Sequence, residues 1–414
     1  MAKSELIAGL DLGSGRVACV LGTPHPDGQG IKVIGGASVL TRGLKGGVVL
    51  NIHETARAIR TVVEKAEEQA GQMVHGLYLG VRGNHIQSFN NGGNYSIART
   101  DKEITAEDVR GVIEHAKAIP ISTDREILHV IPHSFALDRQ QGVPDPIGME
   151  GSLLEVDVHI ITASSSHINN LAKAVAEAGF DVIEPVYSLL ALGEFLVTEE
   201  ERDLGSLLMD FGGQSISLGI FVEGGIRYSK EIPVGSDFIT RDLAHGLRTN
   251  IPTAERIKIN HGVAHPTLLN GDGEEMIEFK GVDGRTMHSV KRHSMVDIIL
   301  PRVEEILTHV GEEIQKSSYG DLAVPGGTIL TGGGSQLSGL PDAAEQILNM
   351  PARNAYAHGG IIDAPPELLD NPTYATAMAL VCYPQSASFN QTTMARRTES
   401  QLFRGVRRWI KDLF

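Results

Sequence analysis

The chain has 414 residues, of which 41% are hydrophobic, and a formal charge of −15 at pH 7. This length suffices for two or three domains with cores of their own, and the apolar share excludes a largely disordered protein. The acidic balance excludes a general nucleic-acid binder, which needs a basic face, and no apolar run reaches the roughly 18 residues of a membrane-spanning helix.

The N-terminus and the cysteines favour a cytoplasmic protein. Met1 to Gly15 contains one lysine, a short apolar stretch and then Asp11, which is not the pattern of a signal peptide. Cys19 and Cys382 both lie in apolar runs, so we expect two small buried side chains of the kind that a reducing compartment allows.

Two distant segments share one pattern of strand, aspartate, small-residue turn and strand. The first runs from Leu10 to Gly22 with Asp11 before its turn, and the second runs from Met209 to Phe221 with Asp210 before its turn. A single Asp-x-Gly after a strand would be an ordinary turn. Two copies with the same flanking strands favour an internal duplication, and the mixture of strand-like and helical patterns predicts an α/β protein.

The residue types in these hairpins suit a phosphate ligand with a divalent cation. Glycines let the backbone approach closely, and successive N–H groups of a turn form a cradle for phosphate oxygens. The aspartates would face Mg²⁺ through ordered water, because Mg²⁺ gives up its water reluctantly. We therefore predict two lobes that close on one metal nucleotide.

Other phosphate and metal motifs fit the chain less well. It contains no Gly-x-x-x-x-Gly-Lys-Ser/Thr, which excludes a P-loop. Gly13-x-Gly15-x-x-Ala18 imitates a dinucleotide fingerprint, but that motif must open a helix and Pro24 ends an apolar strand pattern here. The 16 histidines are scattered without a ligand cluster.

Several elements between and after the hairpins can be predicted in chain order. Helices are expected over 53–70 and 168–178, and Thr105-x-x-Asp108 is a capping signal for a third helix with apolar positions at 109, 112, 113 and 116. His129 and His133 are four apart, yet Pro132 excludes the regular helix that a metal-binding pair would use.

A third glycine cluster follows the apolar run Thr328 to Leu330 and precedes a predicted helix near Pro341. A flat loop of this kind can pack against an adenine ring, although alone it is equally compatible with a simple turn. Glu255 and Lys258 share a helix face and could reach a ribose or base edge, or form only an exposed ion pair.

The C-terminal tail differs from the rest of the chain in charge. Residues 396–414 hold six basic and two acidic residues, so a +4 segment ends a body of −19. In a helix from 401 to 414 the apolar side chains would fall within an arc of about 140°, apart from the basic ones. The apolar set is Leu402, Phe403, Val406, Trp409, Ile410, Leu413 and Phe414, and the basic set is Arg404, Arg407, Arg408 and Lys411.

Such a helix could dock on its own domain or lie on a membrane. The only tryptophan lies on the apolar face, the polar face is basic, and the polar stretch 385–400 would act as a flexible linker of roughly 20–25 Å. These features favour a reversible membrane anchor that binds anionic lipid, and several linked copies would bind more firmly than one.

The order of these motifs resembles the actin-type ATPase superfamily, and within it the FtsA family of bacterial cell-division proteins. Five superfamily elements occur in sequence, namely a first phosphate hairpin, a first connecting helix, a second phosphate hairpin, an adenosine loop and a second connecting helix. They fall at 11–15, 183–192, 210–214, 332–335 and 372–377. The narrower match rests on Gly43 to Val49 and on blocks between 127 and 162.

The resemblance implies an actin-like duplicated RNase H-type fold, with two lobes, a nucleotide cleft and an FtsA-type subdomain 1C. The implied limits are 1–81, 164–203 and 370–384 for subdomain 1A, 82–163 for 1C, 204–233 and 311–369 for 2A, and 234–310 for 2B.

The resemblance also implies the site residues. ATP and Mg²⁺ would be held by Asp11 and Asp210 on the metal side, by Gly13, Ser14, Gly15, Arg16, Gly212, Gly213 and Gln214 around the phosphates, and by Glu255, Lys258, Gly332, Gly333, Gly334 and Ser335 around the nucleoside. Glu184 corresponds to a position that orients water in some relatives. Since hydrolysis varies in the family, binding is the firmer expectation.

The implied role is a division protein that polymerises at the cytoplasmic face of the inner membrane, tethers FtsZ filaments and recruits later division proteins through 1C. The FtsZ C-terminal peptide would dock on 2B through Arg285, Lys291, Arg292 and Arg302. A pilus-assembly actin homologue, which shares 1C, and a small-molecule kinase of the same superfamily are the alternatives.

Overall fold

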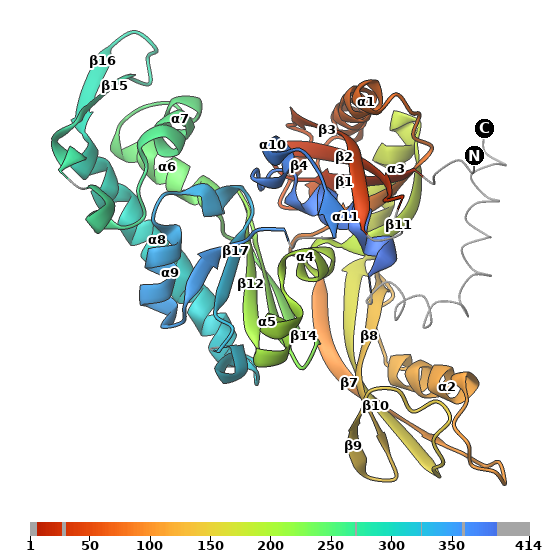
Figure 1. The fold of residues 1–414 in the computed structure, drawn as a ribbon. Helices are drawn as coiled ribbons and strands as arrows, with labels where there is room; N and C mark the ends of the chain where they lie inside the picture. Colours follow the sequence, from red (N-terminus) through yellow and green to blue (C-terminus); the bar gives the residue numbers. More distant parts are fainter. Residues whose placement is uncertain (1–5, 27–29, 270, 324, 358–360, 387–414) are drawn as a thin grey trace. The chain divides into compact units, whose positions relative to one another are not determined.

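The structure, a computed structural model, describes residues 6–26, 30–269, 271–323, 325–357 and 361–386 (Figure 1). The chain divides into two compact units. The first unit is made of the described residues up to 87 and between 166 and 382, and the second is made of residues 88–165 and 383–386.

The first unit contains two sheets of the same design. In one, β1 pairs antiparallel with β2, β2 pairs antiparallel with β3, and β6 and β11 extend the sheet in parallel on the other side of β1. The order is β11 (Asp181–Tyr187), β6 (Gly76–Val81), β1 (Ile7–Leu12), β2 (Arg16–Pro24), β3 (Ile31–Leu40) and β19 (Ile362–Asp363).

The other sheet repeats this arrangement. β12 pairs antiparallel with β13 and parallel with β17, and β14 and β18 extend the two sides. The order is β14 (Gly225–Ile232), β13 (Ile216–Val222), β12 (Ser206–Phe211), β17 (Thr328–Thr331) and β18 (Ala352–Asn354). Asp11 in β1 and Asp210 in β12 therefore occupy equivalent positions, as the duplicated sequence pattern predicts.

Glycines let helices approach both faces of the first sheet. A Cβ at Gly9 would meet the backbone of α11 (Ala375–Cys382), and one at Gly35 would meet the backbone of α1 (Ile52–Ala70). Gly9 pairs with Val20 and Gly35 with Leu21. Because neighbouring residues of a strand point to opposite faces, α1 and α11 cover opposite sides of this sheet.

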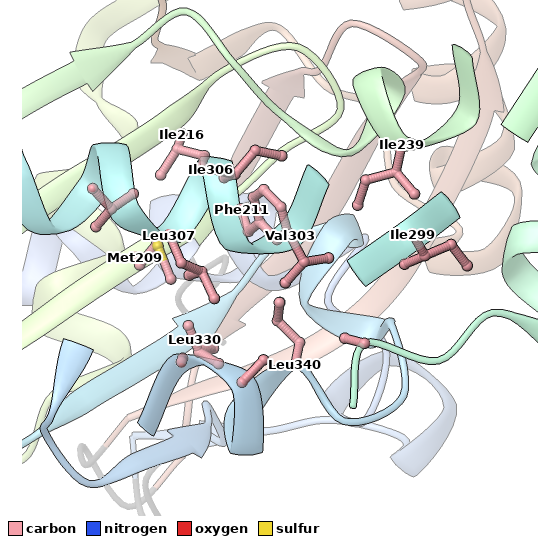
Figure 2. Close-up of a cluster of buried hydrophobic side chains, with 14 of the residues drawn as sticks. Met209, Phe211, Ile216, Ile239, Ile299, Val303, Ile306, Leu307, Leu330 and Leu340 are labelled. Carbon is pink, nitrogen blue, oxygen red and sulfur yellow. The ribbon is translucent and has the colours of Figure 1, made fainter. Parts of the chain in front are cut away.

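A large apolar cluster joins the second sheet to its helices. Figure 2 shows Met209, Phe211 and Ile216 of the sheet facing Val303, Ile306 and Leu307 of one helix, with Leu340 nearby. These side chains are almost completely buried, so their transfer from water drives the packing. The helices are α6 (Ser236–Gly246), α7 (Ile251–His261), α8 (Arg292–Lys316) and α9 (Leu340–Leu348).

The remaining elements of the first unit are short or connect the two sheets. They are β4 (Leu44–Lys45), β5 (Val48–Val49), α3 (Ser165–Ala178, of which Ser165 belongs to the second unit), α4 (Ser188–Leu196), α5 (Glu199–Leu204), β15 (Met276–Lys280), β16 (Met287–Lys291), α10 (Pro366–Leu369) and the 3₁₀ turns η1 (Pro266–Leu269), η2 (Asp272–Glu274), η3 (Gly320–Ala323) and η4 (Gly333–Gln336).

The second unit is a four-stranded sheet with one helix and a core of its own. The sheet order is β7 (Gln87–Ser96), β10 (Leu153–Ser164), β8 (Arg125–Leu137) and β9 (Gln140–Val143), and the helix is α2 (Ala106–Lys117). Thr105 and Asp108 form the predicted capping box, and Val109, Val112, Ile113 and Ala116 are buried as predicted. The turn η5 (Tyr383–Gln385) follows the first unit.

Some sequence predictions are confirmed, but both connecting helices begin later than predicted, the second at Ala375 and not at Pro372. The helices expected over 53–70 and 168–178 are α1 and α3, and both cysteines are buried and free of disulfide bonds. The first connecting helix does not begin at Ile183, because residues 181–187 form β11 and the helix starts at Ser188. β-branched Val182, Ile183 and Val186 favour a strand there, and Pro185 has no N–H to donate within a helix.

His129 and His133 both lie on β8, so they do not share a helix. Val158 pairs with Pro132 and Asp157 with Ser134, which leaves His133 as the extra residue of a β-bulge. Within the described ranges, no helix is long and apolar enough to cross a membrane. Most of the predicted linker 385–400 and the whole predicted tail helix 401–414 lie outside the described residues.

Candidate functional site

The two aspartates of the duplicated hairpins meet on one arginine. Arg82 Nη2 donates to Asp11 Oδ1 at 2.8 Å, and Nη1 donates to Asp210 Oδ2 at 2.9 Å. Nη2 also donates to Thr376 Oγ1 at 2.8 Å. The aspartates are 8% and 2% exposed. Carboxylates from two sheets, 199 positions apart in the sequence, are thus within reach of one guanidinium.

The position of Arg82 follows from the sheet topology. β6 lies parallel to β1, with Asp11 next to Gly80, so the residue after Val81 emerges at the edge where Asp11 lies. Glycines allow the backbone at Arg82 to pack closely against the segment that contains Gly46 and Gly47. Gly47 and Gly83 have φ of +80° and +109°, and a Cβ on either would overlap the facing segment.

The segment before α1 also supports the first hairpin. Gly46 N donates to Ser14 Oγ at 2.9 Å, so the turn of the hairpin and the loop beside Arg82 are directly joined. From the sequence alone, the block Gly43 to Val49 is only a family signature. Its contacts give it a structural role, since it positions Ser14 and the backbone of Arg82.

Burial and charge act against each other on Asp11. Burial raises the pKa of the Asp11 carboxyl, the positive charge of Arg82 lowers it, and the negative charge of Asp210 raises it again, with a net increase. Burial lowers the pKa of Arg82, but the carboxylates around it outweigh this and raise it above its usual value. The guanidinium therefore stays charged and offsets one of the two negative charges.

A third buried carboxyl, Glu231, lies beside this group. Gly83 N donates to Glu231 Oε2 at 3.1 Å and Tyr187 Oη donates to Oε1 at 2.9 Å. Burial raises the pKa of Glu231 to about 7, although hydrogen bonds from Ser217 and Tyr187 oppose the change. Tyr187 in turn has its pKa raised by burial and by Glu231.

The same close backbone contact occurs within the turn of each hairpin. A Cβ at Gly13 would lie 2.7 Å from Arg16 O, and one at Gly212 would lie 2.7 Å from Ser215 O. At the tip of the first turn, Gly15 is exposed and a Cβ there would meet nothing within 4 Å. The two predicted phosphate turns are therefore tight at the base, and the first is open at its tip.

The turn of the second hairpin carries an amide oxygen to which no described residue donates a hydrogen bond. Gln214 Oε1 is buried and accepts no hydrogen bond from the part of the chain that the structure describes. A buried acceptor of this kind is costly unless a donor reaches it. Arg16, the predicted contact at the other hairpin, begins β2 and is exposed.

The third glycine loop lies against Asp210. A Cβ at Gly332 would collide with Asp210 Oδ1, and one at Gly334 would lie 2.7 Å from Phe211 O. Gly332 has φ of +85°, and Ser335 Oγ donates to its carbonyl oxygen at 2.8 Å. Gly333 is exposed with no atom within 4 Å of its Cβ position, so this loop offers an open backbone surface beside Asp210.

Glu255 and Lys258 lie on α7 and form an ion pair of 2.8 Å. Lys258 Nζ also donates to Thr240 Oγ1 at 2.8 Å and to Ser236 O at 3.2 Å, so all three of its donors have acceptors. Ser236 N donates to Gly212 O at 3.0 Å, which links this group to the second hairpin. Glu255 keeps 40% of its side chain exposed.

Sequence reasoning missed Arg82 and Glu231. A charged residue one position after an apolar strand could have identified Arg82, because the ends of parallel strands in α/β sheets are common ligand sites. Glu231 gave no such signal, since β14 reads as an alternating strand. Glu184, the predicted water-orienting residue, lies in β11 three positions before the buried Tyr187.

The four predicted peptide-binding cations are on or near β16 and α8. Lys291 pairs with Glu274 at 2.6 Å, Arg292 with Glu275 at 3.7 Å, and Arg302 with Asp242 at 2.5 Å. Arg285 is exposed in the turn between β15 and β16, and its side chain makes no ion pair with the described residues.

Two family profiles match the chain. One, described as "Cell division protein FtsA", matches residues 207–379, and one described as "SHS2 domain inserted in FTSA" matches residues 83–162.

Three relatives match nearly end to end, and all are described as cell division protein FtsA. The chain is 36% identical to the protein of Pseudomonas aeruginosa, over 92% of this chain and 89% of the relative. It is 36% identical to the protein of Neisseria meningitidis, over 100% of this chain and 99% of the relative. It is 31% identical to the protein of Escherichia coli K12, over 99% of this chain and 96% of the relative.

Solved structures give the fold. A PilM-PilN type IV pilus biogenesis complex matches with a TM-score of 0.62 at 17% identity, covering 91% of this chain and 97% of that one. MreB5 of Spiroplasma citri bound to ADP matches with a TM-score of 0.56 at 12% identity, covering 93% and 98%. These likenesses confirm the predicted actin-like α/β fold, a nucleotide-binding fold in general. With relatives this similar over almost their whole length, the chain belongs to the FtsA family of bacterial cell-division proteins.

Proposed function

We propose that this division protein binds ATP with Mg²⁺ between the two sheets of its first unit. The observation that carries the proposal is the meeting of Asp11 and Asp210 on one guanidinium, with three glycine loops around them. Two buried carboxylates and an unsatisfied amide oxygen at Gln214 are a donor set that suits a hydrated hard cation.

Each group of residues has a role in this proposal. Asp11 and Asp210 hold the cation through water, and the cation, when bound, offsets the charge of the phosphate oxygens. The turn N–H groups cradle the phosphates, and the third loop with Glu255 and Lys258 contacts the nucleoside. The cradle comprises Gly13, Ser14, Gly15, Arg16, Gly212, Gly213 and Gln214, and the third loop comprises Gly332, Gly333, Gly334 and Ser335. Glu184 remains the candidate for orienting water.

Open glycines provide the test. In Gly15→Ala and Gly333→Ala the new methyl meets no protein atom, so the thermal midpoint should stay within about 2 °C of wild type. Each methyl would occupy space next to the ligand, and we expect ATP affinity to fall about tenfold or more. Anisotropy of a fluorescent ATP analogue with MgCl₂ measures the affinity.

The control is Gly311→Ala in α8, where the added Cβ meets only Leu348 at 3.6 Å. It should bind ATP as the wild type does. Unchanged affinity in both loop variants would mean that the nucleotide lies elsewhere.

We also propose that the C-terminal tail anchors the protein to the cytoplasmic face of the inner membrane at the division site. Four basic side chains contribute roughly 1 kcal/mol each near an anionic leaflet, and partial burial of seven apolar ones adds several more. Ordering a helix that contains Gly405 offsets part of this, so one copy binds reversibly and a polymer of many copies binds firmly.

Co-sedimentation with anionic liposomes tests the anchor. Full-length protein should pellet with vesicles and a chain ending at Gln385 should stay in the supernatant. Trp409→Ala should weaken pelleting, while Gln401→Ala, a change in the same predicted helix outside its apolar and basic sets, should not. Equal pelleting of the full-length and shortened chains contradicts the proposal.

The proposed peptide partner is the FtsZ C-terminus, docking on residues 234–310. Support comes from exposed positive charge, with Arg285 outside any ion pair of the described residues and Lys291 half-exposed beside Glu274. Charge reversal at Arg285, Arg292 and Arg302 should weaken peptide binding. Arg57→Glu, an exposed change on α1, is the matched control. Binding unchanged by reversal at Arg292 and Arg302 removes this assignment.

We further propose that the subdomains have the limits that the family resemblance implies, and that subdomain 1C, residues 82–163, recruits later division proteins. Support comes from the second unit's own apolar core, which lets surface residues there change without unfolding the nucleotide unit. A surface variant of 1C should lose these partners and keep ATP affinity.

A further inference from the structure

Among the residues that the structure describes, Arg82, which directly follows β6, is the one whose side chain hydrogen-bonds to both hairpin aspartates. Its two terminal nitrogens are used separately, one for Asp11 at 2.8 Å and one for Asp210 at 2.9 Å. Its side chain is 14% exposed, and those of the aspartates are 12% and 3% exposed. Little water therefore reaches this group of charges.

Two carboxylates this close and this buried require a counter-charge. In its absence they repel each other, and removing one partner of a buried charge group is strongly destabilising. Arg82 supplies one positive charge in a planar fork, which suits two separate oxygen acceptors. A divalent cation could serve the same two carboxylates, since hard cations take oxygen ligands.

We propose that Arg82 is a built-in counter-cation for Asp11 and Asp210, and that a divalent cation competes with the Arg82 guanidinium for these two carboxylates. This inference rests on the proposed function only for the metal-side role of the two aspartates. It makes Arg82 a positioning residue, because it acts on the ligand through the carboxylates that it holds.

The surroundings of Arg82 allow such an exchange. Its backbone is fixed, since Gly83 N is bonded to Glu231 and Gly47 packs against the Arg82 carbonyl. Its long side chain can change rotamer without moving that backbone. Glu231 lies close enough to attract Arg82 electrostatically, so it is a second acid toward which a displaced guanidinium can turn.

The test compares the thermal midpoints of full-length wild type and Arg82→Gln under two conditions. One sample contains millimolar MgCl₂ without nucleotide, and the other contains NaCl at the same ionic strength in place of MgCl₂. In NaCl the variant should melt roughly 5–10 °C lower than wild type, because two buried carboxylates lose their counter-charge. MgCl₂ should restore most of this loss, and it should change the wild type little.

Arg302→Gln is the matched control, because Arg302 also holds two carboxylates, Asp242 and Glu305, outside the candidate site. These acids are 33% and 67% exposed, so MgCl₂ should stabilise this variant no more than wild type. Adding Asp11→Asn and Asp210→Asn to Arg82→Gln should abolish the recovery by MgCl₂. Equal effects of MgCl₂ on wild type and Arg82→Gln, or none on either, overturn the proposal.

Arg82→Lys covers the case in which Arg82→Gln does not fold. A lysine keeps the charge but cannot fork between the two acids, so its response to MgCl₂ should exceed that of wild type. A response equal to that of wild type overturns the proposal.

ATP binding by the same samples separates the two proposals. If the wild type does not bind ATP but MgCl₂ restores the thermal midpoint of Arg82→Gln, only the proposed nucleotide site is contradicted. Tight ATP binding without selective recovery contradicts only the role of Arg82.

Discussion

Individual buried acids in this protein are neutralised in different ways. Asp108 has Arg99 and the Thr105 backbone as donors, and hydrogen bonding to Arg99 is the main cause that lowers its pKa. Glu231 has a tyrosine hydroxyl and a backbone N–H, and burial is the main cause that raises its pKa to about 7. Similar side chains thus make opposite contributions to stability as the pH changes.

Replacing Glu231 should alter how stability depends on pH. A carboxyl whose pKa rises from 4.5 to about 7 on folding binds its proton more tightly in the folded state. The resulting contribution of Glu231 to the free energy of unfolding is fully present below about pH 4.5. It is lost as the pH rises through about 7, a change of roughly 3 kcal/mol. Glu231→Gln should remove this decline, apart from a constant offset. Urea unfolding of both proteins at several pH values checks the prediction, and parallel curves would contradict it.

Elements defined by local chemistry could be predicted from sequence, and elements defined by distant contacts could not. The capping box at Thr105 and the two Asp-bearing turns depend on neighbours a few residues away, and they are present as predicted. The helix start at Ser188 was placed five residues early, because β11 is stabilised by pairing with β6 from another part of the chain. Arg82 was missed for the same reason, since its partners are 71 and 128 positions away.

The cap of α2 provides a test at the scale of one helix. Thr105→Ala removes the side-chain acceptor of Asp108 N and a donor to the Asp108 carboxylate, and it should lower the free energy of unfolding by about 1 kcal/mol. Thr61→Ala is the control, because Thr61 lies inside α1 and bonds only to the carbonyl of Arg57. It should be neutral or slightly stabilising. Chemical denaturation measures both, and equal effects would show that the cap contributes nothing specific.

At the scale of the molecule, the chain is an actin-like protein of the bacterial division machinery with two separately packed units. Its relatives are named as division proteins, whereas the pilus complex resembles it in fold alone, so the main function predicted from the sequence is confirmed. One apolar cluster lies wholly within residues 207–352 and another within 95–160. Each unit therefore has its own source of stability.

Cavities made in the two clusters should act locally. Leu154→Ala, at a fully buried position of the second unit, should cost about 2–5 kcal/mol and raise amide hydrogen exchange mainly within residues 88–165. Leu307→Ala in α8 should raise exchange in the first unit. Mass spectrometry of exchanged peptides distinguishes the two patterns. Uniform protection loss across the chain in both variants would contradict independent units.

The contacts of Arg82 also bear on biosynthesis. Its partners Asp210 and Thr376 lie 128 and 294 positions further along the chain. Domains fold from the N-terminus as a polypeptide leaves the ribosome, but this junction cannot close until α11 has emerged. A chain that ends before Thr376 therefore lacks the complete set of hydrogen bonds around Arg82, beside which the proposed ligand site lies.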